Sequence, residues 1–132
     1  MPVTCKVNHD GARNALIDIV GVVDECDLKP TVVVDIAKLY AEPGYKITNV
    51  RIDDIQYFVE PGLFVELLWE GDQDHMHCLK VTGRGNANYD KLGGRQNPHD
   101  SGTGNIMIAT EGHKDGTRQT FTVQLELVKQ FN

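Results

Sequence analysis

The residues that could most readily bind a metal form the segment His75-Met76-His77-Cys78. Two histidines at positions i and i+2 of a strand project from one face, so His75 and His77 could present two imidazoles to the same ion. A closed zinc site needs four ligands, and the others would have to come from distant loops. The pattern is more typical of an exposed strand start, which is the interpretation we adopt. We therefore predict no metal site and no cofactor.

Groups that could act as nucleophiles or as acid–base pairs are poorly placed for catalysis. Ser101, the only serine, lies in Asp-Ser-Gly-Thr rather than in the GxSxG turn of hydrolases. Cys78 follows His77 too closely for a thiol–imidazole pair, and a free cysteine more often packs as a small apolar side chain. Asp53 and Asp54 are adjacent, and adjacent residues of a strand face opposite sides of the sheet. The sequence thus predicts a protein without enzymatic activity.

The charge and the glycine pattern argue against ligands that carry phosphate. The chain has 19 acidic and 13 basic residues, a formal charge of −6, which leaves few cations to neutralise a nucleic acid backbone. The glycine pairs around Arg84 and Thr103 precede no predicted helix and lack the P-loop lysine, so we interpret them as turns. We expect no direct contact with nucleic acid.

The length and the composition favour one globular domain. At 132 residues with 40% hydrophobic side chains, the chain can build one core and is too short for several. Cys5, Cys26 and Cys78 fit no metal or disulfide spacing, so we expect free thiols in a cytosolic environment. No apolar run approaches the roughly 20 residues that cross a bilayer, and no secretory signal is visible. We expect no contact with a membrane.

Period-2 alternation along the chain predicts the elements that position these residues. Strands are expected at residues 3–7, 13–23, 31–35, 45–59, 63–69, 75–82, 105–110 and 117–128. Residues 36–40 could continue a strand or form one helical turn, and a phase change near Asn49 allows one bulged strand or two abutting strands. No long window shows a helical stripe. The fold class is therefore predicted to be all-β.

These strands are expected to pair as an antiparallel β-sandwich of jelly-roll-like form, a single domain over residues 1–132. The inner faces are expected to carry Leu16 or Ile17 together with Val33, Ile52, Val65, Leu67, Leu79, Ile106, Phe121, Val123 and Leu125. Two segments fall outside the regular pattern. Residues 1–12 could form an extended N-terminal arm, and residues 83–104 are predicted to form a long ordered loop. Loops of that length are uncommon in small domains and often bind a partner.

A series of sequence blocks between Asn49 and Lys129 resembles small β-rich virion structural proteins of tailed bacteriophages. The blocks are Val50-Arg51-Ile52, Val65-Glu66-Leu67-Leu68-Trp69, Val81-Thr82-Gly83-Arg84-Gly85, Leu92-Gly93-Gly94 with Asn97-Pro98, Gly102-Thr103-Gly104-Asn105-Ile106, and the run from Phe121 to Lys129. Their order is more specific than any single block and covers more than half of the chain. Asn105 departs from the pattern, which has an acidic residue there, and residues 1–48 carry no match.

The resemblance implies a capsid decoration (cement) protein that binds the major capsid protein and stabilises the head, or else a head–tail connector or tail-associated protein. It would place the chain in the virion, on the capsid exterior after assembly in the host cytoplasm, as a homo-oligomer with a trimer favoured. The contacts would come from the N-terminal arm and from the loop at residues 83–104. The residues singled out in that loop are Arg84, Asn88, Tyr89, Arg95 and Asn97.

Two other classes of function stay open. A carbohydrate-binding β-sandwich would place aromatic side chains around a concave face. The candidates for that role are Tyr40, Tyr45, Tyr57, Tyr89 and Trp69. A metal-dependent enzyme would need the pair His75 and His77 as ligands.

Overall fold

A computed structural model describes residues 3–71, 75–98 and 102–131, which form nine strands and two short 3₁₀ helices. The elements in chain order are β1 (Val3–Asp10), β2 (Asn14–Val23), β3 (Thr31–Val34), η1 (Ile36–Lys38), β4 (Ile47–Val59), β5 (Phe64–Gly71), β6 (Met76–Val81), β7 (Gly83–Asn88), η2 (Asp90–Leu92), β8 (Gly102–Glu111) and β9 (Gln119–Phe131). In these ranges, no helix has the length and apolar character needed to span a membrane.

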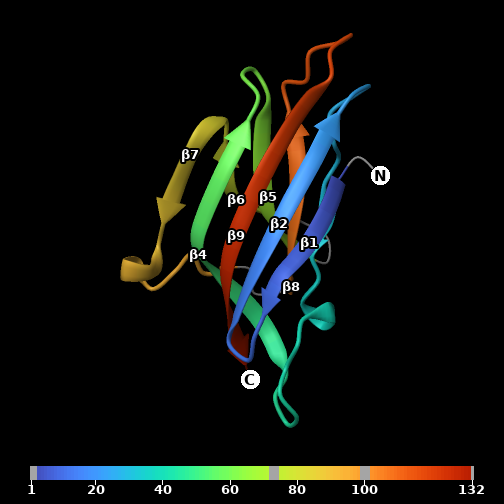
Figure 1. Cartoon of the computed structure of the whole chain (residues 1–132). Helices are drawn as coiled ribbons and strands as arrows, with labels where there is room; N and C mark the ends of the chain where they lie inside the picture. The colour runs from blue at the N-terminus through green and yellow to red at the C-terminus, as the bar shows by residue number, and fades with distance from the viewer. Residues whose placement is uncertain (1–2, 72–74, 99–101, 132) are drawn as a thin grey trace.

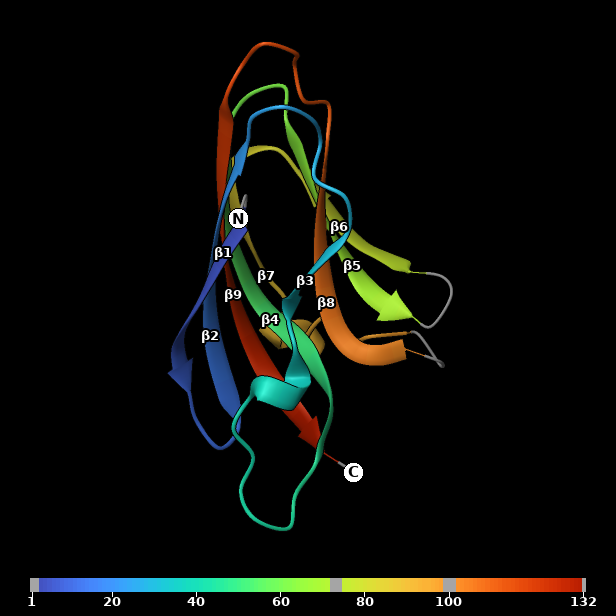
Figure 2. The same cartoon turned by 90° about the vertical axis from the view of Figure 1, so that its right-hand side faces the viewer.

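The strands form two antiparallel sheets that pack face to face (Figure 1). The five-stranded sheet has the order β1-β2-β9-β4-β7, and the four-stranded sheet has the order β3-β8-β5-β6. Figure 2 shows the two sheets from the side as separate layers. From β2 to β9 this is the strand order of a jelly roll, in which two Greek keys wind around one core. The predicted all-β, jelly-roll-like sandwich is confirmed, and β1 is an additional edge strand.

The core lies between the sheets because the strands alternate apolar and polar side chains. In β2, Ile17 and Ile19 are buried, whereas Leu16 and Asp18 are only partly buried and face outward. This settles the choice between Leu16 and Ile17 in favour of Ile17. The other predicted core positions are buried, except that Leu79 is partly exposed at the border of the core.

One glycine is required by this core. Gly21 of β2 lies directly opposite Phe121 of β9, and the aromatic ring covers the glycine. A Cβ atom at position 21 would lie 2.1 Å from the tip of the Phe121 ring, far closer than two carbon atoms can approach. The glycine therefore makes room for a large aromatic side chain in the centre of the sandwich.

Two predicted segments differ from the structure. Residues 3–10 of the expected N-terminal arm are not an arm, because they form β1 and pair with β2 from Val3↔Gly21 to Asp10↔Ala15. The expected loop at 83–104 begins with a strand, since β7 pairs with residues 54–59 of β4. Glycine and asparagine have low strand propensity, so an edge strand composed of them resembles a loop in the sequence. Residues 1–2 and 99–101 of these segments lie outside the described residues.

The two open alternatives are also resolved. Residues 36–38 form the helical turn η1, whose first turn is capped by the Asp35 carboxylate accepting from the Ala37 backbone N–H at 3.0 Å. Residues 47–59 form one continuous strand rather than two. The phase change in that strand corresponds to register shifts between Ile47 and Asn49 and between Ile52 and Asp54.

The end of β9 carries a fully buried lysine. The Lys129 ammonium donates hydrogen bonds to the Asp10 carboxylate and to the carbonyl oxygens of Gly11 and Tyr40, the last two at 2.6 Å. Its backbone N–H donates to the Arg13 carbonyl at 2.7 Å. A buried charge is tolerated only when it is paired and hydrogen-bonded. Lys129 therefore fastens the β1–β2 turn and the connection after η1 to the last strand.

Replacing Lys129 with Met is expected to lower the free energy of unfolding by about 3 kcal/mol, because Asp10 and two carbonyl oxygens lose their donor. Urea denaturation followed by circular dichroism measures the change. The exposed Lys46 provides a matched control, since Lys46→Met removes a charge without a buried partner. Equal stability of the two variants would contradict this role of Lys129.

Candidate binding surface

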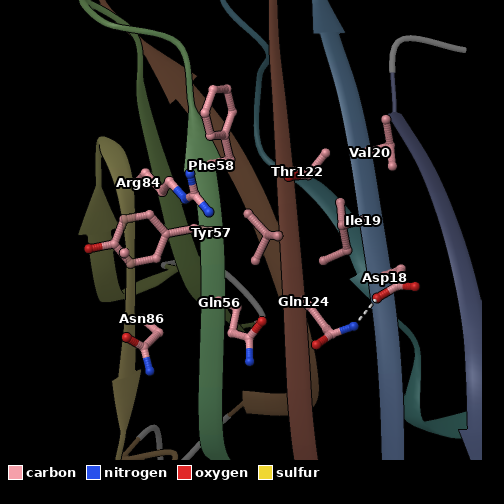
Figure 3. A pocket seen from close by; sticks show the side chains of 12 residues that line it. Asp18, Ile19, Val20, Gln56, Tyr57, Phe58, Arg84, Asn86, Thr122 and Gln124 are labelled. Carbon is pink, nitrogen blue, oxygen red and sulfur yellow. Dashed lines mark hydrogen bonds between the residues drawn. The ribbon is translucent and has the colours of Figure 1, made fainter.

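The outer face of the five-stranded sheet carries a shallow hollow of about 560 Å³ (Figure 3). It lies across β2, β9, β4 and β7, and its outward-facing side chains form two rows perpendicular to the strands. The first row consists of Val20, Thr122, Phe58 and Arg84, and the second consists of Asp18, Gln124, Gln56 and Asn86. Each row is fixed by the strand register, so the hollow is as rigid as the sheet that bears it.

The first row contains the apolar part of the hollow. Phe58 is 49% exposed and Val20 is 48% exposed, and Thr122 lies between them on the central strand β9. Aromatic side chains and arginine are enriched in protein interfaces, and Arg84 lies directly beside Phe58. Two half-exposed apolar side chains on a sheet face can gain free energy when a partner removes them from water.

The second row is rich in carboxamides. Gln124 donates a hydrogen bond from Nε2 to Asp18 Oδ1 at 2.9 Å, and the Asn8 amide donates to the other oxygen of Asp18. Gln56 and Asn86 continue the row and are exposed. A carboxamide both donates and accepts, so this row can bind a polar partner without requiring a particular charge.

A third set of polar groups borders the hollow. Asp54 lies opposite Glu126 of β9 and opposite Asn88 of β7. Among the described residues no hydrogen-bond donor reaches Asp54 Oδ1, although this oxygen is buried. Like charges that face each other across a strand pair destabilise a sheet. The outer face thus carries Asp54 and Glu126 side by side, and neither has an ion-pair partner within residues 3–71, 75–98 and 102–131.

The charged side chains of this surface lie far apart. The two charged side chains of the hollow, Asp18 on β2 and Arg84 on β7, are separated by β9 and β4. At about 4.8 Å per strand they are about 14 Å apart, too far to act on one bond together. The remaining polar groups are amides and a hydroxyl, which hydrogen-bond but do not titrate in the neutral range.

The five residues that the resemblance singled out do not form one surface. Arg84 and Asn88 are exposed on β7, and Arg84 lines the hollow. Tyr89 and Arg95 instead hold the chain after β7 against the sandwich. Asn97 lies farther along, where its amide donates to Asn49 Oδ1 at 2.9 Å.

Arg95 is a structural anchor. Its backbone N–H donates to the Ile52 carbonyl at 2.7 Å, and its guanidinium donates to the Cys78 carbonyl at 2.6 Å. The guanidinium also lies 6.0 Å from the centre of the Tyr89 ring, within cation–π range.

Burial raises the pKa of the Cys78 thiol, and the nearby Arg95 charge opposes that shift. Cys78 is therefore a buried free thiol whose ionisation is disfavoured, whereas Cys5 and Cys26 are free and exposed.

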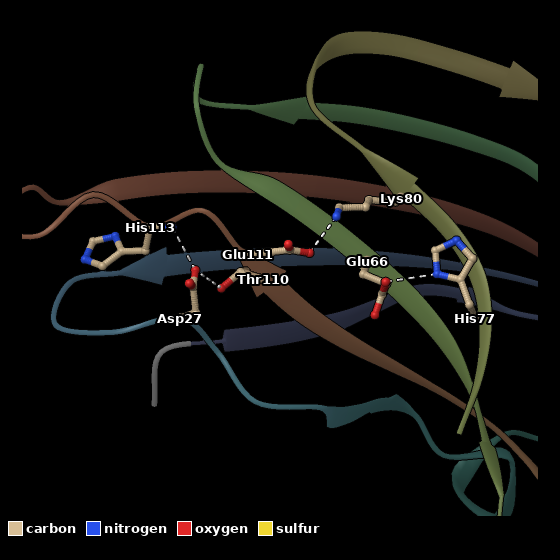
Figure 4. Close-up of polar contacts among 7 residues, drawn as sticks. All are labelled: Asp27, Glu66, His77, Lys80, Thr110, Glu111 and His113. Atoms are coloured by element: carbon tan, nitrogen blue, oxygen red, sulfur yellow. Dashed lines mark hydrogen bonds and ion pairs between the residues drawn. The ribbon is translucent and has the colours of Figure 1, made fainter. Parts of the chain in front are cut away.

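The two histidines considered as metal ligands have separate partners. His77 Nδ1 contacts Glu66 Oε2 at 2.9 Å on the outer face of the four-stranded sheet (Figure 4). His75 Nδ1 accepts from the Gly71 backbone N–H at 3.3 Å. Within the described ranges, no group of three or more His, Cys, Asp or Glu side chains could hold a metal ion.

His113 lies apart from His77, at the opposite end of the same view (Figure 4). Its backbone N–H donates to Asp27 Oδ1 at 3.0 Å, and its ring contacts Gln119 Oε1 at 2.9 Å. Asp27 Oδ1 also accepts from the Thr110 hydroxyl at 3.2 Å. These contacts fasten the segment after β2 to the β8–β9 connection, which is a structural role.

Comparison with solved structures gives a weak likeness. No protein-family model matches the chain, and no curated protein matches it significantly. Among solved structures, the chain is similar to KdgF from Halomonas sp., with 10% sequence identity and a TM-score of 0.33. The match covers 94% of this chain and 80% of that chain.

These comparisons contradict the function that the resemblance predicts. No family model and no curated protein supports a virion role, and KdgF is not a virion protein. The predicted phage decoration, connector or tail role is therefore wrong. The likeness to KdgF, at this TM-score, carries no argument about an activity of this chain.

The fold explains why the sequence blocks were misleading. Val50-Arg51-Ile52 belongs to β4, Val65 to Trp69 to β5, and the run from Phe121 to β9. The glycines at 83, 93, 94 and 104 have positive φ angles, which turns require. Any sandwich with these strand lengths and turns needs a similar alternation, so the pattern reports architecture and not function.

The aromatic residues considered for carbohydrate binding are dispersed. Trp69 is 1% exposed in the core, and Tyr45 packs edge-on against Phe131 with ring centres 5.7 Å apart. Tyr40 lies 5.7 Å from the Lys129 ammonium, and Tyr89 lies under Arg95. Tyr57 lines the hollow without any of the other four. The five do not surround one concave face, so that alternative is wrong with the rest of the predicted function.

Sequence reasoning missed most residues of the hollow. Val20, Phe58 and Thr122 occupy outward positions of strands that are far apart in the chain. Alternation identifies each as outward-facing, but only the sheet order shows that they are neighbours. The sequence does contain a signal for this surface, namely apolar residues at strand positions that face outward and would normally be polar.

Arg95→Ala is expected to destabilise the fold by about 2 kcal/mol, because the buried Cys78 carbonyl loses its donor. Cys78 should also react faster with a thiol reagent such as Ellman's reagent, as the segment after β7 opens. Arg84→Ala is the matched control, since the described residues offer the Arg84 side chain no ion pair. Unchanged stability and Cys78 reactivity in Arg95→Ala would exclude the anchoring role.

Proposed function

We propose that the chain is a non-catalytic self-association domain that binds a second copy of itself through the outer face of its five-stranded sheet. The observation that carries the proposal is the pair of half-exposed apolar side chains, Phe58 and Val20, on either side of Thr122. Burial of apolar surface is the main favourable contribution to protein association.

The two side chains are arranged symmetrically about the central strand. β9 is the middle strand of the sheet, with β2 and β4 on its two sides. A two-fold axis parallel to β9 and passing through Thr122 would place Phe58 of one copy over Val20 of the other, twice per dimer. Such a contact is isologous, since the same patch is used by both subunits.

The polar row supports the same arrangement. The axis would bring Gln124 of each copy together, and a carboxamide can both donate to and accept from its own kind. It would also place Gln56 over Asp18 of the second copy, where the amide can donate to the carboxylate. Face-to-face packing of sheets with their strands nearly aligned is a common geometry.

The proposal assigns binding rather than catalysis to the chain. In support, Asp18 and Arg84 are held apart by two strands, and the polar groups between them are amides and a hydroxyl. The association is homotypic because the apolar and amide rows complement themselves without a further partner.

The test is the dissociation constant of the dimer, measured by sedimentation velocity over a range of concentrations. Phe58→Glu is expected to raise this constant at least about a hundredfold, because two Phe58 side chains leave the interface. Phe64→Glu is the matched control, because Phe64 is 38% exposed on the outer face of the other sheet. Circular dichroism checks that both variants fold.

Two results would overturn the proposal. One is a Phe58→Glu variant that associates as tightly as the Phe64→Glu control. The other is a wild-type chain that stays monomeric at the highest concentration reached.

A further inference from the structure

The edge of the five-stranded sheet at β1 is open. β1 is the outermost strand of that sheet and, among the described residues, pairs with β2 alone (Figure 1). It has 8 residues, compared with 6 in β7, 6 in β6 and 4 in β3, the other three edge strands. A long edge strand exposes a row of unpaired backbone donors and acceptors, to which another strand can add.

The inner side of β1 is covered at Val3 but open at Cys5 and Val7. A groove of about 390 Å³ runs between β1 and the opposite edge of the sandwich. Cys5 and Val7 line it from β1, and Val32–Val34 and Leu39 line it from the other layer. Val7 is 49% exposed, although its neighbour across the strand pair, Ile17, is buried. The sandwich thus leaves apolar surface open beside an unpaired strand edge.

We propose that a second copy of this chain adds its β1 antiparallel to this edge, with Cys5 of one copy opposite Cys5 of the other. The two five-stranded sheets would then form one continuous sheet of ten strands. This contact uses a different surface from the hollow around Phe58 and does not depend on the proposed function.

The sequence of β1 selects a second copy as the occupant. The pairing of β1 with β2 is regular from Val3 to Val7, and a register shift follows between Val7 and His9. Bulges interrupt regular pairing, so the part of β1 free to pair is Val3–Val7, whose centre is Cys5. Pairing about that centre sets the exposed Val7 of each copy against Val3 of the other, which covers both Val7 side chains.

The other registers are less favourable. If β1 of the second copy were shifted by one residue, each inward-facing side chain would lie opposite a residue that faces outward in its own copy. The register centred on Lys6 would set two lysines directly opposite each other, which is destabilising. In the register centred on Cys5, the only charge of this stretch, Lys6, faces the neutral Thr4.

Disulfide crosslinking tests this register directly. Directly opposed residues of antiparallel strands have Cα atoms about 4.5–5.5 Å apart, within the range that a disulfide can bridge. In a Cys26→Ser chain, Cys5 is the one exposed cysteine among the described residues, since Cys78 is buried. Oxidation with copper phenanthroline at mildly alkaline pH should convert most of this chain into a disulfide-linked dimer, resolved on a non-reducing gel.

The matched control moves the thiol by one position. In a Cys5→Ser, Cys26→Ser, Thr4→Cys chain, the two new cysteines would lie opposite Lys6 and not opposite each other. Crosslinking through position 4 should therefore be at least about tenfold slower than through Cys5. Equal rates would indicate random collision and would overturn the proposal, as would the absence of a Cys5-linked dimer.

Two further variants separate this contact from the hollow. Phe58→Glu in the Cys26→Ser chain should crosslink through Cys5 as fast as its parent, and a loss of crosslinking there would overturn an independent β1 contact. Val7→Glu should slow crosslinking at least about tenfold, because a charge enters the paired apolar row. Leu92→Glu, at an 81% exposed position on η2, should have no effect. A Val7→Glu rate equal to that of Leu92→Glu would also overturn the contact.

Discussion

The buried Lys129 ammonium is the constraint that orders one end of the sandwich. Its charge cannot be left without acceptors inside the protein, so the Asp10 carboxylate and the carbonyls of Gly11 and Tyr40 must surround it. These groups come from the β1–β2 turn and from the connection that follows η1. Together with the pairing of β1 with β2 from Val3↔Gly21 to Asp10↔Ala15, this interaction fixes the position of β1, and therefore the edge and the groove beside it.

The two proposed contacts have different geometries and can coexist. The hollow around Phe58 lies on the face of the five-stranded sheet, whereas the β1 contact lies along its edge. Each is a two-fold contact that uses the same patch on both copies, and one such contact alone gives a closed dimer. Together they would link dimers into an open series, so the size of the assembly would depend on concentration.

How much of this could be predicted from the sequence differs between levels of structure. Segments such as Leu63–Trp69 and Thr117–Val128 alternate apolar and polar residues because each strand has the core on one side. The sandwich and most core residues could therefore be predicted. β7 could not, because an edge strand of Gly83, Gly85 and asparagines buries too little to leave an apolar pattern. Its low strand propensity is compensated by pairing with β4, which is a tertiary effect.

The candidate surface was beyond the sequence for a different reason. Val20, Thr122 and Phe58 come from β2, β9 and β4, and their proximity exists only once β9 has inserted between the other two strands. The resemblance failed because it compared features that the fold itself demands, such as turn glycines and strand alternation. A binding surface consists of outward-facing side chains, which the core does not constrain. Their positions therefore follow no regular pattern in the sequence.

The place of β9 at the centre of the five-stranded sheet also has a consequence for how the chain folds. β9 is the last strand in chain order, yet it supplies the hydrogen-bonding edges for both β2 and β4. During synthesis, the edges of β2 and β4 that pair with β9 stay unpaired until residues 119–131 have left the ribosome. Such pairing between distant segments is slow and leaves intermediates prone to aggregation. Loss of these residues would remove the middle of the sheet rather than trim its border.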